Sequence, residues 1–324
     1  MKILYGIQLT GNGHITRSSQ LIKSLKANGF DVDIITSGSN SQIKIPFDIQ
    51  RHFSGLSFFN NDKGGIDWYK TFKMVNINQF FRDIKYDVSG YDLIISDFEP
   101  ISAWAARKHR VKSIGFGNQY SFMSDKLPRP HTKDKISETF LRRFAKCDYN
   151  IGLSYNKIDD FIYQPLINEN LLNREIEDNN FFLVYLPSIS IEYITSQLKD
   201  FKKYKWKIYS NENGKNSKNI EYKKLNKDEF INDMINCSGI ITASGFSTTS
   251  EALILKKKLW SIPLKGQYEQ ICNATLLKSM GVLTDYITTE TIEDWISNYS
   301  VIDYNWEDPT NKIIEKIIKI HERS

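Results

Sequence analysis

The stretch KILYGIQLTGNGHITRSSQLIKSLKANGFDVDIIT, residues 2–36, predicts the fold of the first half of the chain. Its opening run, residues 2–8, is apolar enough to be a buried strand. Residues 15–27 then carry Leu21, Ile22 and Leu25 at helical spacing, and Gly29 fits a helix C-terminus. Residues 31–36 form the next expected strand. Strand, helix and strand in this order are typical of a parallel sheet covered by helices.

The same alternation continues along the chain and then restarts. Strands are expected over residues 91–96 and 112–116, with a helix over 101–108 between them. A second series follows the polar residues 168–180, with strands over 181–186, 205–209, 220–225 and 239–242 and helices over 189–198 and 227–236. We therefore expect an α/β protein with two doubly wound, Rossmann-like domains facing a cleft, residues 1–167 and 168–307. A last helix, within residues 308–324, is expected to pack back on the first domain.

Composition excludes several classes of protein. The chain has 324 residues, and its 43 Lys+Arg against 38 Asp+Glu are too close to balance to indicate a nucleic-acid partner. Its three cysteines are far apart and form no C-x-x-C pair, which argues against a disulfide framework or a zinc site and favours a reducing compartment. No apolar run approaches the about 18 residues of a membrane span, and residues 2–9 are too short for a signal peptide. We expect a cytoplasmic protein, and peripheral contact with the inner face of the membrane stays open.

The first motif that suggests chemistry is Gly11-Asn-Gly-His14, directly after the first strand. Glycines there let the backbone approach a ligand, and the N-terminus of a helix attracts anions. An NAD site would need a further small residue where Thr16 stands and an acid at the end of the second strand, so NAD binding is disfavoured. A tight strand-to-helix turn explains the same residues without a ligand.

The second motif is Ser96-Asp-Phe-Glu-Pro100, at the carboxyl end of a predicted strand. In open α/β sheets that edge faces the ligand. Asp97 and Glu99 are therefore placed to act as a base or to orient one. The alternative is that an acidic residue simply caps the helix that follows.

The third motif, residues 242–252, reads TASGFSTTSEA and passes from a strand through a turn into a helix. Thr248 with Glu251 three residues later has the spacing of a capping box. The amides and hydroxyls of the turn predict a diphosphate pocket; they belong to Ser244, Gly245, Ser247, Thr248 and Thr249. A second acid-amide cluster follows at Gln267, Glu269 and Gln270, and capping alone does not explain it.

These residues resemble the nucleotide-sugar glycosyltransferases of the GT-B fold, in particular the group that includes the peptidoglycan N-acetylglucosaminyltransferase and the natural-product glucosyltransferases. The C-terminal signature of that group is matched from Ser244 to Ala274, and its Gly-x-Gly-His opening is matched at Gly11 to His14. The resemblance implies transfer of a sugar from a nucleoside-diphosphate sugar, with UDP as the expected carrier, to an acceptor hydroxyl. It further implies inversion at the sugar carbon, no metal or other cofactor, and a role in cell-envelope or surface glycan synthesis.

The resemblance also implies a role for each matched residue. His14 would remove the proton of the acceptor hydroxyl, and Asp97 would hold that histidine. Glu251 would bind the donor ribose, while Glu269 and Gln270 would bind the donor sugar. The diphosphate and its surroundings would be contacted by Gly13, Ser188, Ser244, Gly245, Thr248 and Thr249. The family's phosphate loop after the second domain's first strand is Gly/Ser-rich, but here it reads Leu186-Pro-Ser188, so Ser188 is its one hydroxyl.

The acceptor is expected on the first domain and is a glycan, a lipid-linked sugar or a small molecule. Its candidate contacts are Glu99, Asn118, Gln119 and His131, together with residues 55–66. The aromatic residues Phe58, Phe59, Trp68 and Tyr69 would cover it or belong to the core. Asp31-Val-Asp33 superficially resembles a metal-binding pair, but it lies in a strand whose side chains alternate between faces, so we assign no metal there.

Two other functions stay open. Nucleotide-sugar 2-epimerases share this fold, but they would need several acids and a histidine around the sugar. The second domain has no histidine before His321, which weighs against an epimerase. A non-catalytic nucleotide-sugar-binding protein is the other alternative.

Overall fold

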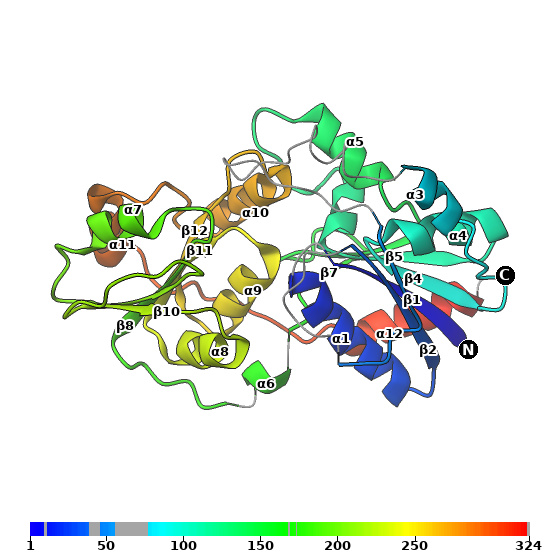
Figure 1. Ribbon diagram of the computed structural model, residues 1–324, viewed down its shortest axis with the longest axis horizontal. Coiled ribbons are helices and arrows are strands. Elements are labelled where there is room, and N and C mark those ends of the chain that lie inside the picture. The colour runs from blue at the N-terminus through cyan, green and yellow to red at the C-terminus, as the bar shows by residue number, and fades with distance from the viewer. Residues whose placement is uncertain (10–11, 39–45, 56–76, 168, 173, 323–324) are drawn as a thin grey trace.

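Two parallel β-sheets, each layered with helices, form the protein (Figure 1). The computed structural model describes residues 1–9, 12–38, 46–55, 77–167, 169–172 and 174–322. The first sheet has seven strands in the order β3-β2-β1-β4-β5-β6-β7, and the second has five in the order β10-β9-β8-β11-β12. This architecture confirms the predicted α/β, Rossmann-like fold class.

The two series of elements follow one another along the chain. The first comprises β1 (Lys2–Gln8), α1 (Asn12–Ala27), β2 (Asp31–Ser37), β3 (Arg51–Phe53), α3 (Ile77–Asp83), β4 (Leu93–Asp97), α4 (Pro100–His109), β5 (Ser113–Gly117), the 3₁₀ helix η1 (Asn118–Met123), α5 (Lys135–Arg143), β6 (Tyr149–Leu153) and β7 (Ile162–Tyr163). The second comprises α6 (Glu169–Leu172), β8 (Phe181–Tyr185), α7 (Ile191–Leu198), β9 (Lys205–Tyr209), β10 (Ile220–Lys223), α8 (Lys227–Asn236), β11 (Gly239–Ala243), α9 (Phe246–Ile254), β12 (Lys258–Ile262), α10 (Tyr268–Ser279), α11 (Thr289–Asn298) and α12 (Thr310–Glu322).

The central strands are apolar because both faces of each sheet are covered. In β1, Ile3, Leu4, Tyr5 and Ile7 are fully buried, as expected for a parallel strand between two layers of helices. The register of β1 with β4 places Ile7 beside Asp97. Because both strands run in the same direction, Asp97 lies at the carboxyl edge of the sheet, where α1 begins.

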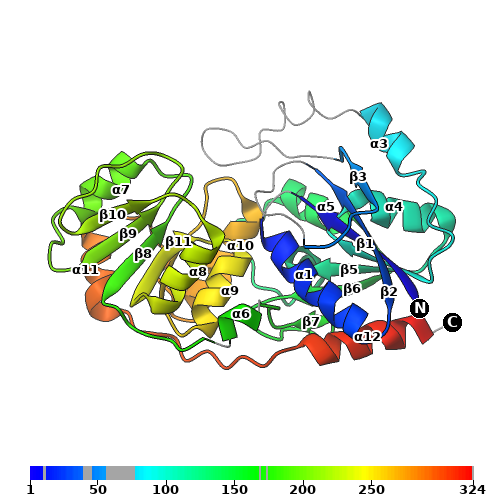
Figure 2. The same ribbon diagram turned by 60° about the horizontal axis from the view of Figure 1, so that its bottom comes forward.

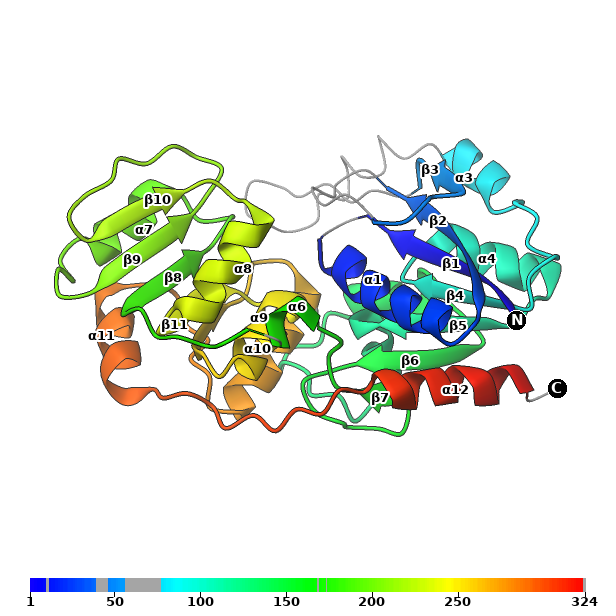
Figure 3. The same cartoon turned by 90° about the horizontal axis from the view of Figure 1, so that it is seen from below.

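Helix α12 returns to the first domain, where it lies beside α1 (Figures 2 and 3). The segment that leads to it is tied down where Trp306 donates from Nε1 to the carbonyl of Pro165 at 3.0 Å. At its far end, Lys112 Nζ donates to the carbonyls of Ile320 and His321 at 3.1 and 3.0 Å. These contacts fix the C-terminal helix to the first domain.

Two helices of the candidate site begin at other residues than the sequence predicts. Helix α1 begins at Asn12 instead of residue 15, so His14 belongs to its first turn. The predicted capping box of Thr248 and Glu251 does not form, because α9 already begins at Phe246 with Gly245 as its N-cap. Thr248 is therefore an interior residue of the first turn.

Several elements escaped the sequence pattern. Strands β3, β6 and β7 are short or, in β6, interrupted by Asn150 and Gly152, which weakens the apolar signal. Residues 118–135 contain η1 and lead into α5, neither of which the sequence pattern indicated. Residues 56–66, and with them Phe58 and Phe59, lie outside the described residues, as do Trp68 and Tyr69. The division at residue 167 stays a prediction; the first sheet ends at Tyr163 and the second begins at Phe181.

Packing of α12 on the first domain gives a stability prediction. Ile317 is fully buried, and truncating a buried isoleucine to alanine costs about 2–5 kcal/mol. We expect Ile317→Ala to lower the free energy of unfolding by that amount in urea titrations. The matched change Glu315→Ala, at an exposed position of the same helix, should stay within about 0.5 kcal/mol of the wild type. Equal effects of the two changes would show that α12 does not pack as described.

Candidate active site

The candidate site lies where the carboxyl edges of the two sheets approach each other. Helix α1 begins on the side of the first domain that faces the second (Figure 2). Its Gly13 lies against α9: a Cβ atom on Gly13 would stand 2.5 Å from Ser247 Oγ. Two helix N-termini therefore meet, and each presents unpaired amides and the positive end of its dipole. An anion such as a diphosphate is favoured beside such an arrangement.

His14 and Asp97 form a hydrogen-bonded pair next to this point. His14 Nδ1 lies 2.8 Å from Asp97 Oδ1, and both side chains are buried. Ser18 Oγ donates to Asp97 Oδ2 at 2.7 Å. Burial alone would raise the pKa of the Asp97 carboxyl, but the guanidinium of Arg17 and the bond to His14 hold that pKa below its ordinary value. Asp97 is therefore a carboxylate at neutral pH, and it can orient the imidazole.

Arg17 is part of this cluster, although the sequence analysis did not single it out. Its Nε lies 2.9 Å from Asp97 Oδ2, and its Nη2 also donates to Asp97 Oδ1. Room for the guanidinium exists because residue 117 is glycine, with φ of 124°: a Cβ there would lie 2.8 Å from Arg17 Nη2. The available sequence signal was the spacing of three residues between His14 and Arg17, which places both on one face of α1.

A hydrogen bond between the domains joins the predicted acceptor and donor residues. Gln119, in η1, accepts from Arg17 Nη2 at 3.0 Å through its Oε1. Its Nε2 donates to Glu269 Oε2, in the first turn of α10, at 3.0 Å. Tyr268 supports the same contact by donating to Glu138 Oε1 at 2.9 Å. The structure thus brings His14, Asp97, Gln119 and Glu269 into one chain of contacts.

Glu251, predicted to bind the donor ribose, lies on α9 and is half-buried. Burial raises the pKa of its carboxyl to about 7, and Lys227 opposes the shift only weakly. Among the described residues, no side chain or amide forms a hydrogen bond or ion pair with it. A carboxylate held in this way is an acceptor available to a ligand's hydroxyl groups.

Other predicted donor residues use their side chains within the protein. Thr249 is fully buried, and its hydroxyl donates to the carbonyl of Gly245 at 2.8 Å and meets Tyr155 OH at 2.7 Å. Ser244 is equally buried, with its Oγ 2.7 Å from Ser261 Oγ. Both hydroxyls are thus engaged by other groups of the protein, and a role for them in donor binding stays a prediction. The partly exposed N-terminal turn of α9, with Gly245 and Thr248, remains available.

The remaining candidates for donor binding, Gln270 and Ser188, differ from the buried Ser244 and Thr249 in their surroundings. Gln270 accepts from the amide of Leu264 at 3.2 Å and donates to Gln267 at 2.8 Å, so its amide group belongs to its own loop. Ser188 is exposed in the turn after β8, on the same sheet edge as α9. That position leaves its hydroxyl accessible from solvent.

The predicted acceptor residues divide in a similar way. Glu99 is fully buried, and it caps α4 by accepting from the amides of Ile101 and Ser102 at 2.8 and 2.6 Å. It acts as the N-cap, and we leave it out of the acceptor site. Asn118 donates to the carbonyl of Leu153 at 3.1 Å, while its buried Oδ1 has no hydrogen-bond partner among the described residues. His131 is exposed.

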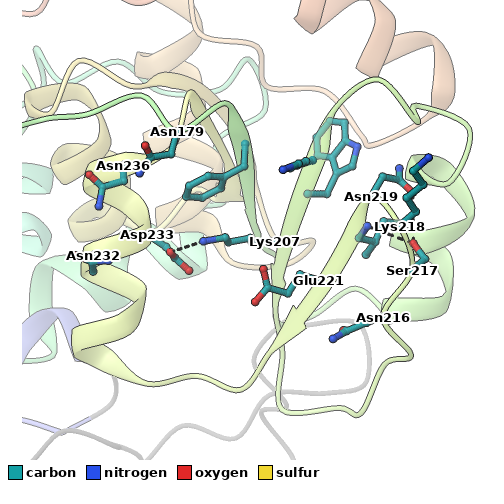
Figure 4. Close-up of a pocket in the computed structure, with 14 residues that line it drawn as sticks. Asn179, Lys207, Asn216, Ser217, Lys218, Asn219, Glu221, Asn232, Asp233 and Asn236 are labelled. Carbon is teal, nitrogen blue, oxygen red and sulfur yellow. Dashed lines mark hydrogen bonds and ion pairs between the residues drawn. The ribbon is translucent and has the colours of Figure 1, made fainter.

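A separate cavity of about 530 Å³ opens at the opposite edge of the second sheet, between the starting ends of β8, β9 and β10 and the end of α8 (Figure 4). The charged side chains of Lys207 and Asp233 in this cavity already form an ion pair, with Lys207 Nζ 2.7 Å from Asp233 Oδ1. None of the candidate residues lines this cavity.

The described residues contain no group of three or more metal-ligating side chains and no helix long and apolar enough to cross a membrane.

Comparison with solved structures shows the same architecture in other proteins. UGT89C1 from Arabidopsis thaliana, solved in complex with UDP, has a TM-score of 0.60 at 13% identity, over 98% of this chain and 93% of that one. The glycosyltransferase SnogD from Streptomyces nogalater has a TM-score of 0.55 at 12% identity, over 99% and 95% of the two chains. A protein described as a UDP-N-acetylglucosamine 2-epimerase, from Listeria monocytogenes, has a TM-score of 0.63 at 10% identity, over 100% and 97%. At these identities the likeness shows the fold alone, which is the two-domain GT-B fold.

Sequence comparison gives the family. No curated protein matches the chain. The family described as glycosyl transferase family 1 matches residues 1–299, which is nearly the whole chain. The predicted resemblance is confirmed: the chain belongs to glycosyltransferase family 1, and the protein is a glycosyltransferase.

Proposed function

We propose that the protein transfers a sugar from a UDP-linked donor to an acceptor hydroxyl, with inversion and without a metal ion. The observation that carries this proposal is the buried His14–Asp97 pair beside the meeting N-termini of α1 and α9. It combines a base, an orienting carboxylate and an anion site within one region. UGT89C1 has been solved with UDP, with UDP-L-rhamnose and with quercetin, which supports a nucleotide-sugar donor and a small-molecule acceptor. A glycan or lipid-linked acceptor in envelope or surface glycan synthesis rests on the motif resemblance.

Each step of the reaction has a group in this site. His14 Nε2 accepts the proton of the acceptor hydroxyl as its oxygen forms a bond to the anomeric carbon. The bond from that carbon to the diphosphate oxygen breaks, and UDP leaves from the opposite face. The imidazolium that forms is stabilised by Asp97, which also fixes its orientation. The charge that develops on the diphosphate meets the amides at the start of α9.

Loss of the base tests this mechanism. We expect His14→Gln to lower kcat by about 10²–10⁴-fold, because a positioned general base contributes that much. UDP release from UDP-glucose or UDP-N-acetylglucosamine, with simple phenol and alcohol acceptors, measures the rate. Binding of UDP, measured by calorimetry, should change little.

The control for this experiment is His321→Gln, at a histidine far along α12, which should match the wild type. Turnover of His14→Gln close to that of the wild type would contradict the assigned base. Absence of UDP release by the wild type with all donors would contradict the transfer reaction itself.

Glu251 gives a pH-dependent prediction. Burial raises the pKa of the Glu251 carboxyl to about 7 in the folded protein, so the folded state binds this proton more tightly than the unfolded state does. Proton binding therefore stabilises the folded state fully below the unfolded pKa, and this stabilisation is lost as the pH rises through about 7. Glu251→Gln should therefore unfold at the same urea concentration as the wild type at pH 4.5 but be more stable by about 1–3 kcal/mol at pH 8. UDP affinity should nevertheless fall about tenfold or more, since the amide is a weaker partner for the ribose hydroxyls.

The matched variant is Glu293→Gln, at an exposed position of α11, which should alter neither quantity. Unchanged UDP affinity in Glu251→Gln would remove Glu251 from the donor site.

A 2-epimerase is the second candidate, because a protein of that description has the same fold. The two functions differ in whether an acceptor is needed. Incubation with UDP-N-acetylglucosamine alone, followed by NMR of the sugar, should leave the donor's configuration at C2 unchanged. Formation of the C2 epimer without an acceptor would favour the epimerase.

A further inference from the structure

We propose that Gln119 sets the tautomer of His14, and that Glu269 of the second domain fixes the orientation of Gln119, so that contact between the domains prepares the base. The inference rests on the proposed function only in calling His14 the base. Its basis is a hydrogen-bonded chain through Asp97, Arg17, Gln119 and Glu269. Gln119 acts through other residues and is a positioning residue.

His14 Nδ1 stands between two groups with opposite demands. Asp97 Oδ1, at 2.8 Å, can only accept a hydrogen bond, whereas Arg17 Nη2, also at 2.8 Å, can only donate one. A neutral imidazole satisfies one of them. With the proton on Nδ1, the ring donates to Asp97 and keeps a free lone pair on Nε2. With the proton on Nε2, Nδ1 accepts from Arg17 and the ring has no basic nitrogen for the acceptor.

The hydrogens of Arg17 Nη2 decide between these states. A terminal guanidinium nitrogen carries a pair of N–H groups. One is donated to Asp97 Oδ1, and the other is donated to Gln119 Oε1 at 3.0 Å. Nη2 also lies within hydrogen-bonding distance of His14 Nδ1, but a pair of N–H groups cannot serve all three acceptors. We therefore assign the two N–H groups to Asp97 Oδ1 and Gln119 Oε1, and none to His14. Nδ1 therefore carries the proton and donates it to Asp97, which leaves Nε2 free to act as the base.

The orientation of the Gln119 amide is decided in turn by Glu269. A carboxylate only accepts, so the NH₂ group of Gln119 must face Glu269 Oε2, which lies 3.0 Å away. The amide oxygen then necessarily faces Arg17. The side chain of Gln119 is buried, so water does not readily replace either partner. Without Glu269 the amide can turn over, present its NH₂ group to the guanidinium, and release an N–H of Nη2 toward His14.

This series of hydrogen bonds also couples His14 to the residues proposed to bind the donor. Glu269 uses Oε2 for Gln119, and in the described part of the protein no hydrogen bond to its Oε1 is seen. That second oxygen is the one available to a donor sugar. The base is therefore in its reactive tautomer when α10 and η1 are in contact, which is the arrangement in which donor and acceptor face each other.

NMR of the free protein with ¹⁵N-labelled histidine tests this inference directly. The His14 signals are those missing from His14→Gln. In the wild type at pH 8 we expect the proton on Nδ1. In Gln119→Met, which has a similar size but no acceptor for Nη2, we expect the proton on Nε2. In the double variant Gln119→Glu with Glu269→Gln, the carboxylate at position 119 still accepts from Arg17 and the amide at position 269 donates to it, so the proton should remain on Nδ1.

Turnover provides a second readout. We expect Gln119→Met to lose up to about 10⁴-fold in kcat, the size of effect that a wrong histidine tautomer has in a serine protease. If Gln119→Met does not fold, Glu269→Gln replaces it: an amide at position 269 no longer fixes Gln119, and a second His14 signal with the proton on Nε2 should appear.

A wild-type proton on Nε2, or a proton that stays on Nδ1 in both Gln119→Met and Glu269→Gln, would overturn the inference. The spectra need no substrate. A protein that shows the expected tautomers but no sugar transfer would therefore refute the proposed function and leave this inference standing.

Discussion

The buried negative charge of Asp97 is the constraint on which the geometry of the site depends. A carboxylate taken out of water has to be paired and hydrogen-bonded, and removing one partner of a buried pair typically costs about 3–5 kcal/mol. Asp97 meets this requirement with His14, Arg17 and Ser18, all from the first half of α1. The start of α1 is therefore held against the end of β4. Because α1 carries Gly13 at its first turn, the same contacts bring its N-terminus to α9.

Two carboxyl groups of the site have opposite environments. Asp97 is hydrogen-bonded to several donors and its pKa lies below the ordinary value, so it is a permanent negative charge beside His14, the proposed base. Glu251 is without a hydrogen-bonding partner among the described residues, and burial raises its pKa to about 7. Environments that separate the pKa values of carboxyl groups are typical of sites in which those groups have different roles. The first carboxyl serves the protein's own residues, and the second is available to a ligand.

Sequence patterns predicted those parts of the molecule that local chemistry determines. The bounds of β1, β9 and α8 agree with the structure, because their apolar runs and, for α8, the Asn226 cap are local signals. The pairing of His14 with Asp97 followed from a motif resemblance. Arg17 was missed because its role depends on Gly117, exactly one hundred residues further along the chain, making room for the guanidinium.

The threonines in the first turn of α9 show a second reason why sequence patterns did not identify every residue of the site. Thr248 and Thr249 are neighbours of the same type, yet one is partly exposed and the other is fully buried against Tyr155 of the first domain. Sequence cannot separate them, since the difference arises from how the domains meet. The same holds for Gln119 and Glu269, which lie 150 residues apart.

A crystal structure of the protein with UDP tests the central claim, that the reaction takes place where α1 and α9 meet. The account predicts the diphosphate at the N-terminal turn of α9 beside Gly13, with the ribose hydroxyls on Glu251. UDP bound elsewhere, such as in the cavity between β9, β10 and α8, with Glu251 and the α9 turn untouched, would contradict it.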